Sequence, residues 1–277
     1  MIIVDAQAHI WGANTPERPW APNREAHRDI PMSEEELRGE MDAAGVQRCM
    51  LVPPSWEGNR NELALEAARL HPDRFAVMGR LPVDAPDARN QLIRWREQPG
   101  MMGLRFTFSN PRTAAPLIDG SIDWVWEIAE KSGIPAMVSV TAGEVPVVGE
   151  IARRHPALKL IMDHCALYGG KKDEAAFAGL DALLAISDFA NVAVKASALP
   201  CYTTDSYPYR WLHPHLKRVY EAFGARRIFW GSDLTRLPCT YRQAVTMFTD
   251  EMPWITANDL QWIMGRGLCE WVGWPLV

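Results

Sequence analysis

Residues 4–11 of the 277-residue chain read VDAQAHIW. They follow three mostly apolar residues, a pattern that predicts a buried β-strand ending in polar side chains. Side chains two apart in a strand point the same way, which predicts that Asp5, Gln7 and His9 share one face. Two histidines at this spacing would be typical of a metal site, but glutamine stands first here. The segment therefore leaves open a metal site, a disabled one and a site that works without metal.

Similar short apolar runs alternate with segments at helical spacing along the whole chain. The predicted strands span residues 2–6, 48–52, 75–79, 103–106, 136–140, 158–162, 192–195 and 227–230. The predicted helices span 33–45, 61–70, 86–97, 122–131, 149–154, 174–186, 214–223, 241–250 and 257–271. This alternation is typical of a (β/α)8 barrel, an α/β fold, here predicted as a single TIM-barrel domain over 1–277. A doubly wound open sheet is the runner-up, but no GxGxxG follows the first strand.

The amino-acid composition argues against two classes of partner, nucleic acids and membranes. Hydrophobic residues make up 48% of the chain, the net charge is −5, and no block of Lys or Arg stands out, so we expect neither a nucleic-acid nor a membrane partner. No apolar run approaches a membrane span, and the first residues do not resemble a leader sequence. The five dispersed cysteines predict free thiols and a cytoplasmic protein. A homo-oligomer remains open.

Polar side chains follow most of the predicted strands. The carboxyl ends of barrel strands meet at one face, and burying polar groups without partners is costly, so their convergence predicts a site there. The candidates are Gln7, His9, Arg80, Arg105, Ser139, His164, Lys195 and Asp233, with Trp11 and Arg236 nearby. Residues 12–32 and 200–211 also follow strands and are expected to cover this face.

Each candidate has a structural alternative. A lone histidine such as His9 or His164 is more often a satisfied core residue than a catalyst. Asp233 could cap a helix, and Arg105 could tether a loop. Their occurrence together at strand ends favours a functional role.

Five motifs carry a resemblance to a known family. They are VDAQAHIW (4–11), GLRF (103–106), IMDHCA (161–166), NVAVKASAL (191–199) and RIFWGSDLTR (227–236). In this order the chain resembles the amidohydrolase superfamily, in particular the amidohydrolase-related (amidohydrolase 2) branch that contains sugar lactonases and pyrone-dicarboxylate lactonase. The resemblance spans nearly the whole chain and implies a TIM barrel.

The departures from the family pattern bear on metal binding. Metal-dependent members use two histidines on strand one, a carboxylate or carboxylated lysine on strand four, histidines on strands five and six, and an aspartate on strand eight. Here only His9, His164 and Asp233 match, while strands four and five offer Arg105 and Ser139. We therefore expect no metal. If one Zn²⁺ is bound, His9, His164 and Asp233 are its predicted ligands.

The resemblance and the residues together predict a hydrolase that opens an ester or lactone in a small, carboxylated substrate. Asp233 is expected to take a proton from water, His164 and His9 to orient that water and polarise the carbonyl, and Arg105 to hold a carboxylate or oxyanion. The predicted substrate contacts are Gln7, Trp11, Arg80, Ser139, Lys195 and Arg236.

Two other function classes remain as alternatives. One is a metal-dependent decarboxylase of an aromatic or unsaturated acid on the same fold. The other is a binding protein without activity, against which the retained Asp233 and His164 argue.

Overall fold

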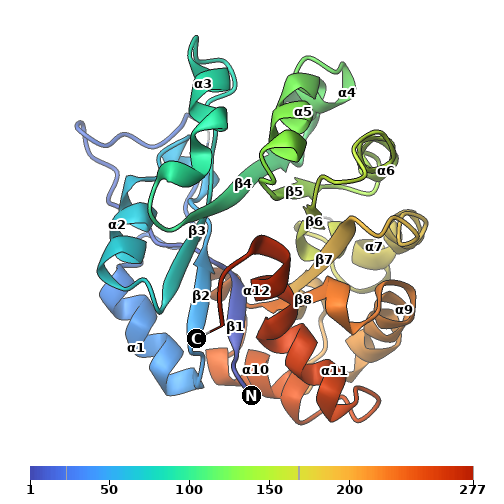
Figure 1. Cartoon of the computed structure of the whole chain (residues 1–277). Coiled ribbons are helices and arrows are strands. Elements are labelled where there is room, and N and C mark those ends of the chain that lie inside the picture. Colours follow the sequence, from blue (N-terminus) through green and yellow to red (C-terminus); the bar gives the residue numbers. More distant parts are fainter. Residues whose placement is uncertain (23, 168, 277) are drawn as a thin grey trace.

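The computed structural model describes residues 1–22, 24–167 and 169–276. Eight strands form one parallel sheet in sequence order, and helices surround it (Figure 1). The strands are β1 Val4–Ala8, β2 Arg48–Leu51, β3 Phe75–Gly79, β4 Met101–Phe108, β5 Ala136–Val140, β6 Leu160–Met162, β7 Val192–Ser197 and β8 Ile228–Gly231. All eight predicted strands are present, and their order confirms the TIM barrel and excludes a doubly wound sheet.

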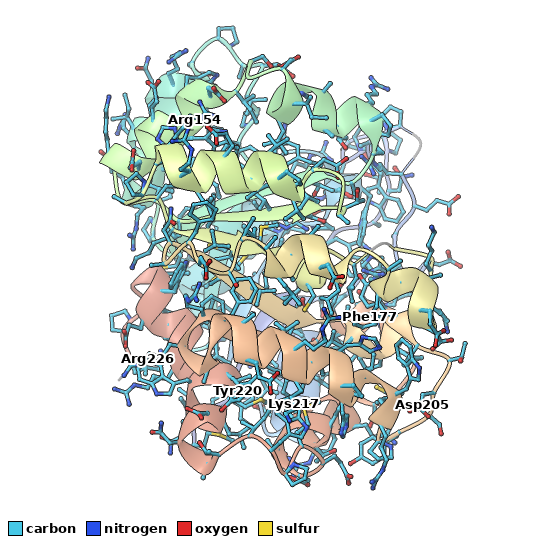
Figure 2. The ribbon with its side chains drawn as sticks, turned by 90° about the vertical axis from the view of Figure 1, so that its right-hand side faces the viewer. Arg154, Phe177, Asp205, Lys217, Tyr220 and Arg226 are labelled. Atoms are coloured by element: carbon cyan, nitrogen blue, oxygen red, sulfur yellow. The ribbon has the colours of Figure 1, made fainter. Side chains whose placement is uncertain are left out.

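The helices follow the strands in the expected alternation. They are α1 Glu34–Ala44, α2 Glu62–Leu70, α3 Ala88–Ile93, α4 Pro111–Ile118, α5 Asp123–Lys131, α6 Val145–Arg154, α7 Asp173–Phe177, α8 Leu180–Leu184, α9 His213–Phe223, α10 Tyr241–Thr249, α11 Ala257–Gln261 and α12 Gly267–Val272. Polar contacts join neighbouring helices on the outer surface. Arg154 of α6 pairs with Asp123 of α5 at 2.8 Å, and Tyr220 of α9 donates to Asp259 of α11. Arg154 and Tyr220 are labelled in Figure 2.

The predicted helices differ from the structure in several places, of which three change the order or continuity of the elements. Helix α4 was not predicted, although Asn110 and Thr113 form a capping box at its start. The predicted helix 174–186 is broken into α7 and α8, with Gly179 immediately before α8. The predicted final helix contains a π-helical turn, Trp262–Arg266, between α11 and α12.

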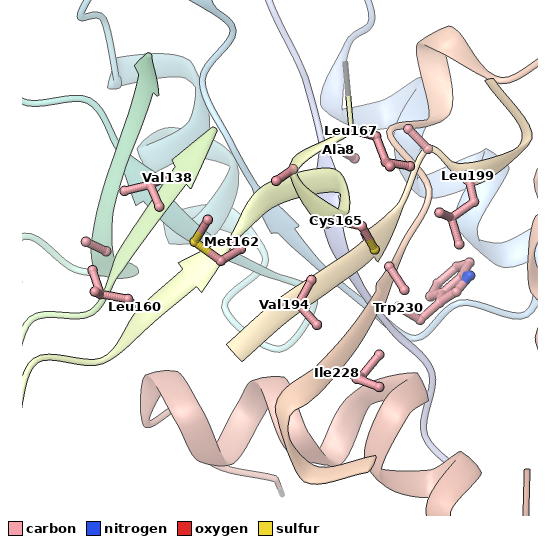
Figure 3. Packing of buried hydrophobic residues seen from close by; sticks show 14 of the residues in the cluster. Ala8, Val138, Leu160, Met162, Cys165, Leu167, Val194, Leu199, Ile228 and Trp230 are labelled. Carbon is pink, nitrogen blue, oxygen red and sulfur yellow. The ribbon is translucent and has the colours of Figure 1, made fainter. Parts of the chain in front are cut away.

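The strands bury apolar side chains on both faces, as their continuous hydrophobicity predicts. The outward side chains pack beneath the helices, among them Val138, Leu160 and Val194 (Figure 3). The inward side chains form a second cluster that includes Met50, Met78 and Phe229, against which α12 packs. The lower half of the barrel is therefore an apolar plug, and polar chemistry is confined to the other end.

The expected alternation along β1 is wrong at one point. The register between β1 and β2 shifts between Asp5 and Ala8. Gln7 and His9 face the upper cavity, but Asp5 turns away to accept from Tyr241 of α10, while Ala6 joins the inner cluster. The irregularity breaks the period of two on which the prediction rested.

Asp5 instead fastens β1 to the end of β8. Its Oδ1 accepts from the backbone N–H groups of Gln7 and Ser232, both at 2.8 Å, and its Oδ2 accepts from the hydroxyls of Tyr241 and Ser232. The backbone N–H of Asp233 donates to the carbonyl of Gln7 at 2.7 Å. We call this junction between β1 and the residues that follow β8 the seam. The seam thus sets the distance between β1 and the residue that follows β8.

Loss of this carboxylate should destabilise the whole barrel. Asp5→Ala leaves several buried donors without an acceptor, so we expect the free energy of unfolding to fall by about 3–5 kcal/mol. The measurement is urea unfolding followed by circular dichroism. Asp42→Ala is the control, because it removes only an exposed ion pair with Arg74 and should cost less than about 1 kcal/mol. Equal effects of the two substitutions would contradict a role for Asp5 in closing the seam.

Candidate active site

A cavity of about 280 Å³ lies at the carboxyl ends of the strands. Eight of the ten side chains expected there line it: Gln7, His9, Arg80, Arg105, Ser139, His164, Asp233 and Arg236. They come from six different strands or the turns after them, which agrees with the common direction of all strands in the barrel. The structure brings these side chains together, and their catalytic and binding roles stay predictions.

The structure places Trp11 and Lys195 elsewhere. Trp11 is 2% exposed, and its backbone N–H donates to the carbonyl of Met32. Its ring packs edge-on against Trp56, which lines the cavity in its place. Lys195 is fully buried, because β7 continues to Ser197 and leaves the lysine one step below the rim. Neither Trp11 nor Lys195 lines the cavity, and their contact with substrate stays a prediction.

Lys195 lies beneath the cavity and contacts the side chain of Gln7, which lines it. Its ammonium group lies 2.5 Å from Gln7 Oε1 and 2.8 Å from Asp163 Oδ1. An ammonium group can only donate, so the amide oxygen of Gln7 must face Lys195 and the amide nitrogen must face the cavity. That nitrogen lies 3.3 Å from His9 Nε2. Lys195 therefore orients the amide that contacts His9.

The hydrogen bonds of His9 determine its tautomer. Nδ1 lies 2.5 Å from the carbonyl of Val52, which can only accept, so Nδ1 carries a proton. Nε2 accepts from the amide of Gln7 and is unprotonated. It lies 3.2 Å from Asp233 Oδ1, a buried oxygen without a hydrogen-bond partner in the described part of the chain. Two acceptors thus face each other, and a water that donates a hydrogen bond to each, or a cation, suits a bridging position beside them.

Asp233 is held as a carboxylate. Burial raises the pKa of Asp233, but the positive charge of Arg236 beside the carboxylate acts in the opposite direction, and the net shift is downward. Arg236 Nη1 lies 3.1 Å from Oδ2, and His164 Nε2 lies 3.8 Å from the same oxygen. One carboxylate oxygen is therefore paired, and the other is open to the cavity.

His164 and Asp233 both adopt the left-handed conformation, with φ of 50° and 54°. This conformation costs about 1–3 kcal/mol for a residue other than glycine and is concentrated at functional sites. Ser197 Oγ lies 2.8 Å from His164 Nδ1. Burial lowers the pKa of His164 to about 4, so the ring is neutral at pH 7 and can exchange hydrogen bonds with a substrate.

Arg105 shares a buried carboxylate with Lys195. Asp163 is fully enclosed between Arg105 Nε at 2.7 Å and Lys195 Nζ at 2.8 Å. Burial raises the pKa of Asp163, and the two cations lower it further than burial raises it, so the carboxyl stays ionised. Arg105 also donates to Thr107 Oγ1 at 2.9 Å. It is thus held rigidly at the cavity floor, with part of its charge balanced.

Several cavity-lining residues were missing from the prediction, and three of them carry rings that face the site: His27, Trp56 and Tyr202. His27 and Tyr202 lie in the two irregular segments that were expected over this face. No spacing rule points to one residue within a segment of this kind, so their position could be found only from the fold. Trp56 follows Pro53–Pro54 at the end of β2, where the prediction named no side chain.

The residues that could hold a metal differ from the predicted set. Ligand atoms of His9, His27 and Asp233 lie within 4.8 Å of one another, so His27 stands where His164 was predicted. Two imidazoles and the carboxylate of Asp233, whose Oδ1 has no hydrogen-bond partner in the described chain, are a three-ligand donor set that suits one Zn²⁺. Bound there, a zinc ion would polarise a carbonyl oxygen as a Lewis acid. The cations Arg80, Arg105 and Arg236 in the same cavity would weaken its binding.

The sequence matches the amidohydrolase family Amidohydro_2 over residues 4–275. The chain belongs to this family. The resemblance read from the five motifs is thereby confirmed. In the part that the structure describes, no helix is long and apolar enough to span a membrane.

Three relatives place this amidohydrolase among known proteins. It is 27% identical to an L-fucono-1,5-lactonase of Burkholderia ambifaria over 247 residues, covering 83% of this chain and 79% of the relative. An amidohydrolase of Burkholderia multivorans with bound zinc superposes with a TM-score of 0.84 at 20% identity, covering 99% of this chain and all of the other. A probable 2-pyrone-4,6-dicarboxylic acid hydrolase of Acinetobacter baumannii, with citric acid bound, gives 0.81 at 16% with the same coverage. The two structures support the fold.

Zinc affinity should separate the observed donor set from the predicted one. We expect His27→Ala to weaken zinc binding, measured by calorimetry, by at least about tenfold. His164→Ala should change it less than about twofold, because His164 lies outside the cluster. The reverse order would restore His9, His164 and Asp233 as the ligands. Absence of zinc binding to the wild type at millimolar concentration would show that the cluster is not a metal site.

Proposed function

We propose that this amidohydrolase hydrolyses the ester bond of a lactone that carries a carboxylate. The observation that carries the proposal is the buried Asp233 oxygen, which faces the unprotonated Nε2 of His9 and has no hydrogen-bond partner in the described chain. The similarity to a lactonase at 27% identity supports the reaction class. The excess of arginines around the cavity supports an anionic substrate.

In the proposed reaction, a water molecule donates to Asp233 Oδ1 and attacks the acyl carbon of the lactone. The proton moves to Asp233 as the new C–O bond forms, and the carbonyl oxygen becomes an oxyanion near Arg105 and His164. The ring C–O bond then breaks, and Asp233 returns the proton to the leaving alkoxide. The product is a hydroxy acid, and the enzyme is unchanged.

The low pKa of Asp233 favours cleavage of an activated bond, such as an ester or lactone. A carboxylate with a depressed pKa is a weak base, and the charge of Arg236 is one cause of that depression. A weak base suits an electrophile that is already activated. An ester or lactone meets this requirement far better than an amide. We therefore favour lactone hydrolysis without a required metal, with His9, His27 and Asp233 as the place where one zinc ion would bind.

Decarboxylation of an aromatic or unsaturated acid is the second candidate, because the zinc-type donor set of His9, His27 and Asp233 could support it. The two functions differ in their products. A decarboxylase releases carbon dioxide and depends on its metal, whereas a lactonase releases one acid equivalent per turnover and leaves the carbon count unchanged. A panel of carboxylated lactones and aromatic acids, assayed with and without a chelator, distinguishes them.

Asp233→Asn tests the proposed base. The amide cannot accept the water proton, so we expect turnover of a carboxylated lactone to fall by at least about a hundredfold while the melting temperature changes little. Asp181→Asn is the control, since its carboxylate forms an exposed pair with Arg218 and does not line the cavity, and turnover should stay normal. Near-normal turnover in folded Asp233→Asn would remove Asp233 from the mechanism.

A further inference from the structure

A second chamber of about 300 Å³ adjoins the active-site cavity. Both are lined by Ser55, Arg80, Arg105 and Thr107, so the side chains of these four residues form the boundary between them. Residues of β4, the longest strand, and of helix α4 line this chamber. Together the two spaces fall within the usual size of small-molecule sites, roughly 300–1,000 Å³. A ligand in the first cavity could therefore extend into the second.

The second chamber differs from the first in its walls. Leu81 and Val83 follow β3, while Phe106 and Phe108 come from β4, and all four line the chamber. The two phenylalanine rings are parallel to within 9°, with centroids 5.6 Å apart. The first cavity is lined mainly by histidines, arginines and hydroxyl groups. A ligand that spans both would have a polar end and an apolar end.

Arg80 stands at the boundary as a buried cation. Its Nε donates to the carbonyl of Pro53 at 2.6 Å, and its Nη2 donates to Thr107 Oγ1 at 3.1 Å. No carboxylate in residues 1–22, 24–167 or 169–276 forms an ion pair with it. Burial and the nearby Arg105 lower the pKa of Arg80 to about 9, so it is charged at pH 7. A buried guanidinium with neutral partners alone is suited to an anionic group of a ligand.

Other charged residues that line the chamber also favour an anionic group near Arg80. Half-buried Arg24 lines the chamber and adds positive charge near Arg80. Asp84 also lines it, but it is exposed and lies at the solvent side. The inner end of the chamber is thus cationic, and its walls are apolar.

We propose that the second chamber is a substrate subsite for an aryl or branched alkyl substituent on a lactone whose carboxylate binds Arg80. This inference rests on the proposed lactone hydrolysis and narrows its substrate class. The lactone ring lies in the first cavity near Asp233, and the substituent packs on Phe106, Phe108 and Leu81. Small, fully hydroxylated sugar lactones leave this apolar surface uncovered.

The test compares two carboxylated six-membered lactones, one with and one without a phenyl substituent. Binding is measured separately by calorimetry with the matching cyclic ether acids, which lack the scissile carbonyl. We expect the wild type to bind the phenyl ether acid at least about tenfold more tightly than the unsubstituted acid, and to show the same preference in kcat/KM for the lactones. Equal affinities for the two acids would overturn the subsite.

A filling substitution tests the location of the subsite. Val83→Trp places an indole in the chamber and should abolish the tenfold preference. Val147→Trp on α6 is the matched control, because Val147 is half-buried but lines neither cavity, and the preference should remain. A preference that survives Val83→Trp would place the substituent elsewhere.

The two proposals fail in different ways. If the ether acids bind with the expected preference but neither lactone is hydrolysed, the proposed function is wrong and the subsite stands. If both lactones are hydrolysed without a phenyl preference, the subsite is wrong and the function stands. Absence of both binding and hydrolysis contradicts both.

Discussion

The active-site geometry depends on one buried cation. Lys195 is fully enclosed in the barrel and would be very costly to bury without the carboxylate of Asp163 at 2.8 Å. Because the ammonium can only donate, it determines which end of the Gln7 amide faces His9. His9, oriented also by Val52, then presents an unprotonated nitrogen beside Asp233. A charge buried below the cavity thus sets the hydrogen bonds of the residues that line it.

The same carboxylate links the two halves of the site. Asp163 also holds Arg105, so the cation at the cavity floor and the cation beneath Gln7 share one counter-ion. Asp5 provides a second fixed point, since it joins β1 to the turn that carries Asp233. The first network orients side chains and the second sets the spacing of strands. Both are needed to bring Asp233 to 3.2 Å from His9, where the proposed water is activated.

The barrel could be predicted from the sequence because its strands are buried on both faces and read as continuous apolar runs. Positions at strand ends could be predicted for the same reason. The position of Lys195 could not be predicted in this way. The sequence placed it at the end of its strand, but β7 extends two residues further, to Ser197, and so buries it. The register shift in β1 turns the side chain of Asp5 away from that of Gln7. The alternation of polar and apolar residues in the sequence of β1 does not reveal this shift. His27 reaches the cavity through an irregular segment, where periodicity carries no information.

The arginines explain why a site with zinc-type ligands suits chemistry that does not require zinc. Arg236 pairs with one oxygen of Asp233, and Arg80 and Arg105 face the same cavity. These cations favour a carboxylated substrate and a developing oxyanion, and they oppose a divalent ion. The ligand cluster therefore favours a metal ion, whereas the arginines favour an anion. We propose that the effect of the arginines is the larger one and that the site binds an anionic lactone.

The hydrogen-bonding state of His9 tests the account most directly. Nitrogen-15 NMR of the histidine-labelled protein at pH 7, assigned with a His9→Asn variant, reports which ring nitrogen carries the proton. We predict a neutral ring protonated at Nδ1 and unprotonated at Nε2, and partial protonation of Nε2 in Lys195→Met, where the Gln7 amide is free to turn its oxygen toward His9. A wild-type ring protonated at Nε2 would contradict the claim that Lys195 sets the site through Gln7.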